Sequence, residues 1–169
     1  MGWPRPDGRL VTRKRAWPPS CEAAALELSR RVAASDVRNE TLTQLELVFD
    51  DLAMAYPVTP PQQLLQRLRR QLSYVSGIMD ASKTLDEHRR LVVIGAWLSL
   101  LAATVHVDLE QQAAATARLR TAASSARHAG HDEIRAWCLE TEAWRVLTNG
   151  ACRQAVDLSC AAQELATAG

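Results

Sequence analysis

Two tryptophan-bearing segments with the same internal order decide the fold of this chain. They are GAWLSLLAATVHVDL (Gly95 to Leu109) and RAWCLETEAWRVLTNG (Arg135 to Gly150), and each is followed by an alanine-rich segment. Trp97 and Trp137 are 40 residues apart. A long helix, a turn and a second helix that recur at such a period are typical of helical repeat proteins. The pattern therefore predicts stacked helical hairpins.

Apolar residues spaced three and four apart predict helices along most of the chain. The expected helices span about 20–34, 39–55, 60–78, 84–106, 110–129, 132–147 and 151–168. No β-rich run competes with them, so we expect an all-α fold: tetratricopeptide-like antiparallel hairpins in a short right-handed solenoid of about seven helices. Residues 1–19 are rich in proline, glycine and basic residues and are expected to form a flexible arm, which leaves 20–169 as one helical domain.

Composition excludes several classes of function. The chain has 169 residues and a formal net charge of +1, which does not predict a nucleic-acid surface. Its four cysteines form no CxxC pair and have no zinc-type spacing, so we predict no metal site and no cofactor. They are interpreted as reduced thiols of a cytoplasmic protein.

One segment has nearly the length of a membrane span. The 17 residues from Leu91 to Val107 carry no charge, which is the lower limit for crossing a bilayer. Amphipathic helices surround this segment, so we interpret it as the buried central helix of a bundle. The N-terminus has no apolar core of a secretory signal. We therefore expect a cytoplasmic protein without a membrane association.

The strongest candidate site is the sequence AWCLETEAW. On a helix, Trp137, Glu140, Thr141 and Trp144 share one face. A carboxylate between two indoles can accept a hydrogen bond from a ligand amine or hydroxyl while the indoles stack on the ligand. Trp97 has the equivalent place in the preceding repeat. These residues predict a ligand-binding groove.

A structural interpretation of the same residues is also open. The tryptophans would then belong to the core, and Glu140 would pair with Arg90 or Arg135.

His106 is the remaining candidate for the groove. It lies close to Asp108, and such a pair can act as acid and base or can simply close a helix end. The sequence has no GxSxG, GxxxxGK[ST], GxGxxG or HExxH motif, so we assign no catalytic residue. These observations favour a binding module over an enzyme.

Five segments together resemble a known family. They are RRVAASDV (30–37), AYPVTPPQQLL (55–65), GAWLSLLAATVHVDL, ARHAGHDEIRAWCLETEAW (126–144) and AVDLSCAAQELA (155–166). Residues 22–169 resemble the C-terminal, tetratricopeptide-like half of actinobacterial helix-turn-helix regulators of the xenobiotic-response-element type. The resemblance implies a half that senses a ligand and dimerises, beside a domain that binds DNA. Related architectures in other Gram-positive bacteria sense short peptides.

The chain departs from that family at two places. Residues 1–21 are too few for a helix-turn-helix, so we expect no direct binding of nucleic acid. The chain is either a sensor fragment or a stand-alone relative without a DNA reader. Glu110 stands where such repeats commonly place a turn glycine, so this loop is expected to differ.

The sequence thus predicts a sensing or protein-interaction module of transcriptional regulation. It would bind a small molecule or peptide, and would pair with itself or with a related regulator. The alternative is a stand-alone helical enzyme of secondary metabolism, with Glu140 or His106 as acid or base.

Overall fold

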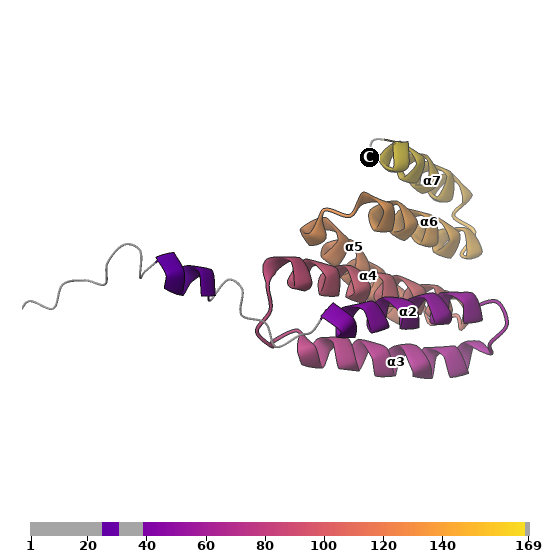
Figure 1. Ribbon diagram of the computed structural model, residues 1–169. Helices are drawn as coiled ribbons and strands as arrows, with labels where there is room; N and C mark the ends of the chain where they lie inside the picture. Colours follow the sequence, from indigo (N-terminus) through magenta and orange to yellow (C-terminus); the bar gives the residue numbers. More distant parts are fainter. Residues whose placement is uncertain (1–24, 31–38, 168–169) are drawn as a thin grey trace, which may run out of the picture. The chain divides into compact units, whose positions relative to one another are not determined.

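Helices joined by short loops make up residues 39–167. The computed structural model describes residues 25–30 and 39–167 (Figure 1). Residues 25–30 are helical, and six longer helices follow: α2 (Asn39–Ala55), α3 (Pro61–Ile78), α4 (Leu85–Asp108), α5 (Gln112–Ala129), α6 (Asp132–Thr148) and α7 (Cys152–Thr167). These described residues contain no strand, so the all-α prediction is confirmed.

The chain divides into two units, Met1–Ala33 and Ala34–Gly169. The predicted arm, residues 1–19, lies outside the described residues, as do the ends of the helix expected at 20–34. Helices α2 to α7 all belong to the second unit. Its helices follow one another in chain order from α2 and α3 to α6 and α7 (Figure 1). The right-handed tetratricopeptide-like solenoid stays a prediction.

Helix α4 is the central element of this unit. It packs against α2, α3, α5 and α6. Leu91, Leu98 and Val105, spaced seven apart, are fully buried, so α4 is enclosed along its length. Among the described helices it is the one long and apolar enough to cross a bilayer, and 61% of its most apolar stretch is buried within the protein. Neighbouring helices thus account for the uncharged run in the sequence.

The core changes character along the chain. Between α2, α3 and α4 it consists mainly of leucines, among them Leu42, Leu52 and Leu68. Between α4 and α5 small residues such as Ala122 and Ala126 allow a close approach of the two helices. The cluster under α6 and α7 holds three buried residues, Ala143, Val146 and Ala155. Because hydrophobic stabilisation scales with buried apolar area, the α6–α7 end has the smallest share.

The helix ends explain where the hairpins turn. Thr84 begins α4 with a reciprocal capping box to Glu87. Gly130 ends α5 in the left-handed conformation, φ 63°, which glycine adopts without a steric penalty. Gly150 follows α6 with φ 82°. Glu110, at the equivalent place after α4, also has a left-handed backbone, φ 57°. The loop therefore keeps the conformation expected of glycine although the residue differs.

Candidate functional site

An open groove lies over α4, between α2 and α6. Both α2 and α6 pack on α4, and the groove between them has a volume of about 550 Å³. We call it the central groove. It is lined by Phe49, Ala53 and Tyr56 of α2, by Trp97, Leu100, Leu101 and Thr104 of α4, and by Trp137, Glu140, Thr141 and Trp144 of α6. Five of the six residues predicted for the site thus line one cavity.

The same spacing recurs on all three helices. Each helix contributes residues at positions i, i+4 and i+7, which share one face of a helix. These are Phe49, Ala53 and Tyr56; Trp97, Leu101 and Thr104; and Trp137, Thr141 and Trp144. The α2 residues are part of the site that sequence reasoning missed, and this shared spacing is the signal that identifies them.

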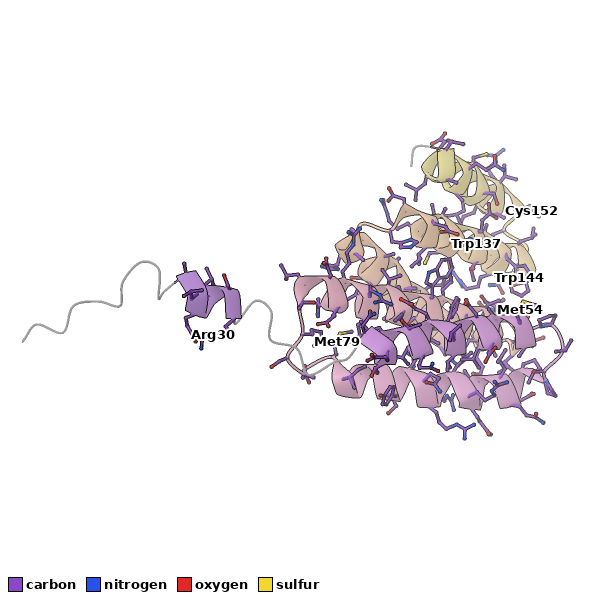
Figure 2. All side chains as sticks on the ribbon, viewed as in Figure 1. Arg30, Met54, Met79, Trp137, Trp144 and Cys152 are labelled. Carbon is purple, nitrogen blue, oxygen red and sulfur yellow. The ribbon has the colours of Figure 1, made fainter. Side chains whose placement is uncertain are left out.

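The three tryptophans differ in how they are held. Trp97 is half-buried, with its ring centroid 5.6 Å from that of Phe49 and 6.0 Å from that of His131. Trp137 is 53% exposed and Trp144 is 37% exposed, and both lie along α6 (Figure 2). The interpretation that places all three in the core is therefore wrong for the two indoles of α6. Exposed indoles lining a cavity are surfaces that a ligand can cover.

Glu140 lies between these two indoles and has no cationic partner among the residues that the structure describes. Its Oε2 accepts a hydrogen bond from Ser159 Oγ at 3.2 Å. Arg90, a partner considered for it, instead makes two hydrogen bonds to Glu46, at 3.0 and 2.9 Å. Arg135, the other, pairs with Asp132 at 2.5 Å. The structural interpretation of Glu140 as half of an ion pair with either arginine is therefore also wrong.

The 40-residue repeat shows that Glu140 replaces an apolar residue. Its equivalent in the preceding hairpin is Leu100, and the equivalent of Ser159 is Leu119. Both leucines belong to one buried apolar cluster between α4 and α5. The second hairpin thus has a hydrogen-bonded polar pair where the first has an apolar contact. Because a polar pair gains little in stability over a well-packed apolar one, its presence points to a role other than folding.

His106 does not line the central groove. Its side chain is buried, and Nδ1 lies 2.7 Å from Gln111 Oε1. Burial lowers the pKa of His106 from the usual 6.5, which the hydrogen bond to Gln111 opposes. Asp108, its expected neighbour, accepts a hydrogen bond from the Tyr56 hydroxyl at 2.8 Å. The predicted His106–Asp108 pair therefore does not form.

The hydrogen bond to Asp108 holds the side chain of Tyr56, which lines the groove. Burial, followed by the hydrogen bond from its hydroxyl to Asp108, raises the pKa of Tyr56 well above the usual 10. Tyr56 is therefore neutral at physiological pH. Its hydroxyl is engaged, so this residue offers a ligand mainly its ring.

Two further cavities adjoin the central groove. The α2–α4 cavity, about 650 Å³, shares Phe49 and Trp97 with it, and also contains Asp50, Asp86 and Arg89. The α6–α7 cavity, about 380 Å³, shares Trp137 and Glu140 with it. This second cavity is also lined by Asp132, Glu133, Ala162 and Leu165.

No protein-family model, curated protein or solved structure matches this chain.

Proposed function

We propose that this protein is a sensing module that binds a small molecule or a peptide in the central groove. One observation carries the proposal: three helices present equally spaced side chains to one open cavity. There, two exposed indoles flank a carboxylate that forms no ion pair within residues 25–30 and 39–167. Ligand sites are typically concave and mostly apolar, with a few polar groups that orient the ligand. Glu140 and Thr141 are such groups here.

The position of the groove suits a sensor. It is formed by α2, α4 and α6, so a bound ligand contacts helices that are up to about a hundred residues apart in sequence. Ligand binding that bridges such elements stabilises one arrangement of them over others. A partner protein can bind that arrangement of the helices in preference to the others. This behaviour agrees with the proposed relationship to ligand-sensing halves of transcriptional regulators, and with a cytoplasmic location.

The first test is native mass spectrometry of the full chain, before and after exposure to extract of its host. We expect a retained mass in the wild-type protein and none in Trp137→Ala or Glu140→Ala. Leu147→Ala is the matched control, because Leu147 is an exposed apolar residue of α6 that does not line the groove. Far-ultraviolet circular dichroism must show that all variants are folded. Retention of the same mass by folded Trp137→Ala protein would contradict the proposal.

The alternative, an enzyme of secondary metabolism, has less support from the geometry. His106 lies outside the groove, and Glu140 is the one ionisable carboxylate among the residues that line the central groove. Acid–base catalysis generally needs groups positioned on the reacting atoms. The alternative predicts turnover of a retained molecule that Glu140→Gln abolishes while binding persists. Unchanged turnover in that variant would exclude Glu140 as the acid or base.

We also propose that copies of the chain, or a copy and a related regulator, associate through α7. Cys152, Val156 and Cys160 form an exposed row along this helix, and Val156 is 62% exposed. Sedimentation of the wild-type protein and of Val156→Asp tests this proposal. We expect a dimer that the substitution converts to monomer. A wild-type protein that sediments as a monomer would contradict self-association.

A further inference from the structure

We propose that the natural ligand of the groove is a basic amphipathic peptide that extends through all three cavities. This inference rests on the proposed function and goes further, because it assigns the sign of the ligand's charge and its extent.

The extent follows from shared lining residues. Phe49 and Trp97 line both the α2–α4 cavity and the central groove, while Trp137 and Glu140 line both the central groove and the α6–α7 cavity. The three cavities therefore lie next to one another in a run across α2, α4, α6 and α7. Each cavity alone has a volume typical of a site for one small molecule. A run of three accommodates a chain with several side chains better than it does a compact molecule.

The charge follows from the carboxylates along this run. Asp50 and Asp86 line the α2–α4 cavity, and Glu133 lines the α6–α7 cavity. Glu140 lines both the central groove and the α6–α7 cavity. No arginine or lysine among the described residues forms an ion pair with any of these four. The other two lining carboxylates, Glu46 and Asp132, pair with Arg90 and Arg135. The run thus carries an excess of negative charge.

Two arginines line the run, and Arg90 is already paired with Glu46, so one cation remains to be counted against the excess of negative charge. Arg89 lines the α2–α4 cavity, and its Nε donates a hydrogen bond to the backbone carbonyl of Ala129 at 2.9 Å. Its charge offsets one of the four unpaired carboxylates. The remaining negative potential attracts a cationic ligand and repels phosphates, which excludes a nucleic-acid backbone as the occupant.

The aromatic residues add a second reason for a cation. Ammonium and guanidinium groups are attracted to the faces of indoles. An arginine or lysine lying between Trp137 and Trp144 would place its charge beside Glu140. The floor beneath, Leu100 and Leu101, is apolar and accepts a leucine or valine of the same peptide. Alternating basic and apolar side chains therefore match the run.

The test uses two amidated twelve-residue probe peptides, one of leucine and lysine and one of leucine and glutamate in the same order. Isothermal titration calorimetry measures their binding to the full-length protein. We expect the lysine probe to bind at least tenfold more tightly, with an affinity that falls as salt is raised. Glu140→Gln should weaken it about tenfold, as expected for one charge-assisted hydrogen bond. Asp50→Asn should weaken it about threefold by removing one charge.

Asp51→Asn is the matched control, because Asp51 is an exposed carboxylate beside Asp50 that does not line the cavities. It should leave the affinity unchanged. Equal or tighter binding of the glutamate probe would overturn the cationic assignment, and if Trp137→Ala still abolished that binding, the proposed function would stand. Blocked arginine that binds as tightly as the lysine probe would overturn the extended peptide. A wild-type protein that binds no probe and retains no mass from extract would contradict both proposals.

Discussion

The α4–α5 and α6–α7 hairpins share one sequence pattern but differ in what covers them. At the 40-residue offset, Ala115 and Ala122 of α5 match Ala155 and Ala162 of α7, and all four are buried. The interface inside each hairpin is thus built in the same way. Helix α4 packs against α2, α3, α5 and α6, whereas α6 packs against α4, α5 and α7, and both helices line the groove.

Equivalent residues of the two hairpins differ in burial, and the buried ones stabilise the fold while the exposed ones can bind a ligand. Trp97 of α4 packs against Phe49 and His131, while its equivalent, Trp137, is exposed. Leu100 and its equivalent, Glu140, both line the groove, but Leu100 is buried in an apolar cluster while Glu140 is only partly buried. The second hairpin thus keeps the alanines of its internal interface, which serve folding. It has a polar residue where the first hairpin has an apolar one, and this residue is available for recognition.

The largest expected effect comes from removing the first tryptophan. Trp97→Ala should lower the free energy of unfolding by about 2–3 kcal/mol, less than for a fully buried tryptophan because Trp97 is half-buried. Trp137→Ala should lower it by less than about 1 kcal/mol, because much of that indole is already in water. Urea denaturation followed by circular dichroism measures both. Equal losses in the two variants would break the distinction between the hairpins.

The second prediction converts the α6–α7 hairpin into the α4–α5 type. The double variant Glu140→Leu, Ser159→Leu restores the apolar pair of the first hairpin and should raise the free energy of unfolding by about 1 kcal/mol. It should also abolish binding of the lysine probe. A more stable protein without binding would show that the polar pair serves recognition. A less stable variant would show instead that the pair is part of the fold.

The third prediction compares the two equivalent loops. Gly150 and Glu110 both have positive φ, 82° and 57°. Gly150→Ala should cost about 1 kcal/mol, because a Cβ is strained in this region. Glu110→Gly should gain at most about 0.5 kcal/mol, because relief of strain is offset by the greater freedom of glycine in the unfolded chain. Thermal unfolding of both variants is the measurement. A loss of stability in Glu110→Gly would show that the glutamate side chain stabilises its loop.

The smallest expected effect is a pH dependence that only α4 has. The equivalent of His106 in α6 is Val146, and both are buried. Because burial lowers the pKa of His106 below the usual 6.5, the unfolded chain binds this proton more readily than the folded protein. Above pH 6.5, His106 therefore does not reduce the free energy of unfolding. This free energy declines as the pH falls from 6.5 to the lower pKa of His106 in the folded protein.

His106→Val tests this by copying the residue of α6. On going from about pH 7.5 to about pH 5.5, the wild-type protein should lose more stability than the variant, as measured by urea denaturation. Parallel losses would mean that His106 takes up its proton equally well in both states. His128→Val serves as the control, because His128 is exposed.

The sequence predicted the helices well because their signals are local. Proline, glycine and capping residues fix the ends of α3, α4 and α5, and apolar spacing fixes which face is buried. The spacing of Ala115, Leu119, Ala122 and Ala126 places them on one helix face, and all four are buried. The α6 side of the candidate site was also predictable from the sequence. Its residues share one face of any α-helix: Trp137, Glu140, Thr141 and Trp144.

What the sequence could not predict depends on contacts between distant segments. Phe49 and Tyr56 belong to the apolar face of α2 and pack against the core cluster, and only the packing of α2 on α4 places them at the groove as well. His106 and Asp108 are close in sequence, yet each finds its partner elsewhere, in Gln111 and Tyr56. The choice among competing polar partners is decided by tertiary geometry, on which helical spacing carries no information.

The small cluster beneath α6 and α7 has a consequence for motion. This cluster between the two helices consists of Ala143, Val146 and Ala155, all with short side chains. Separation of α7 from α6 therefore loses less apolar burial than separation of the helices around α4, and α7 is the more loosely held helix. We expect its amides to exchange with deuterium sooner than those of α4, through openings that leave the remaining helices intact. Trp137 and Glu140 lie on α6, at the end that we expect to open first. Phe49 and Trp97 lie on α2 and α4, at the end that we expect to stay closed. A ligand that touches both would slow the exchange of α6 and α7, and occupancy would be transmitted as a change in how often the end of the protein opens.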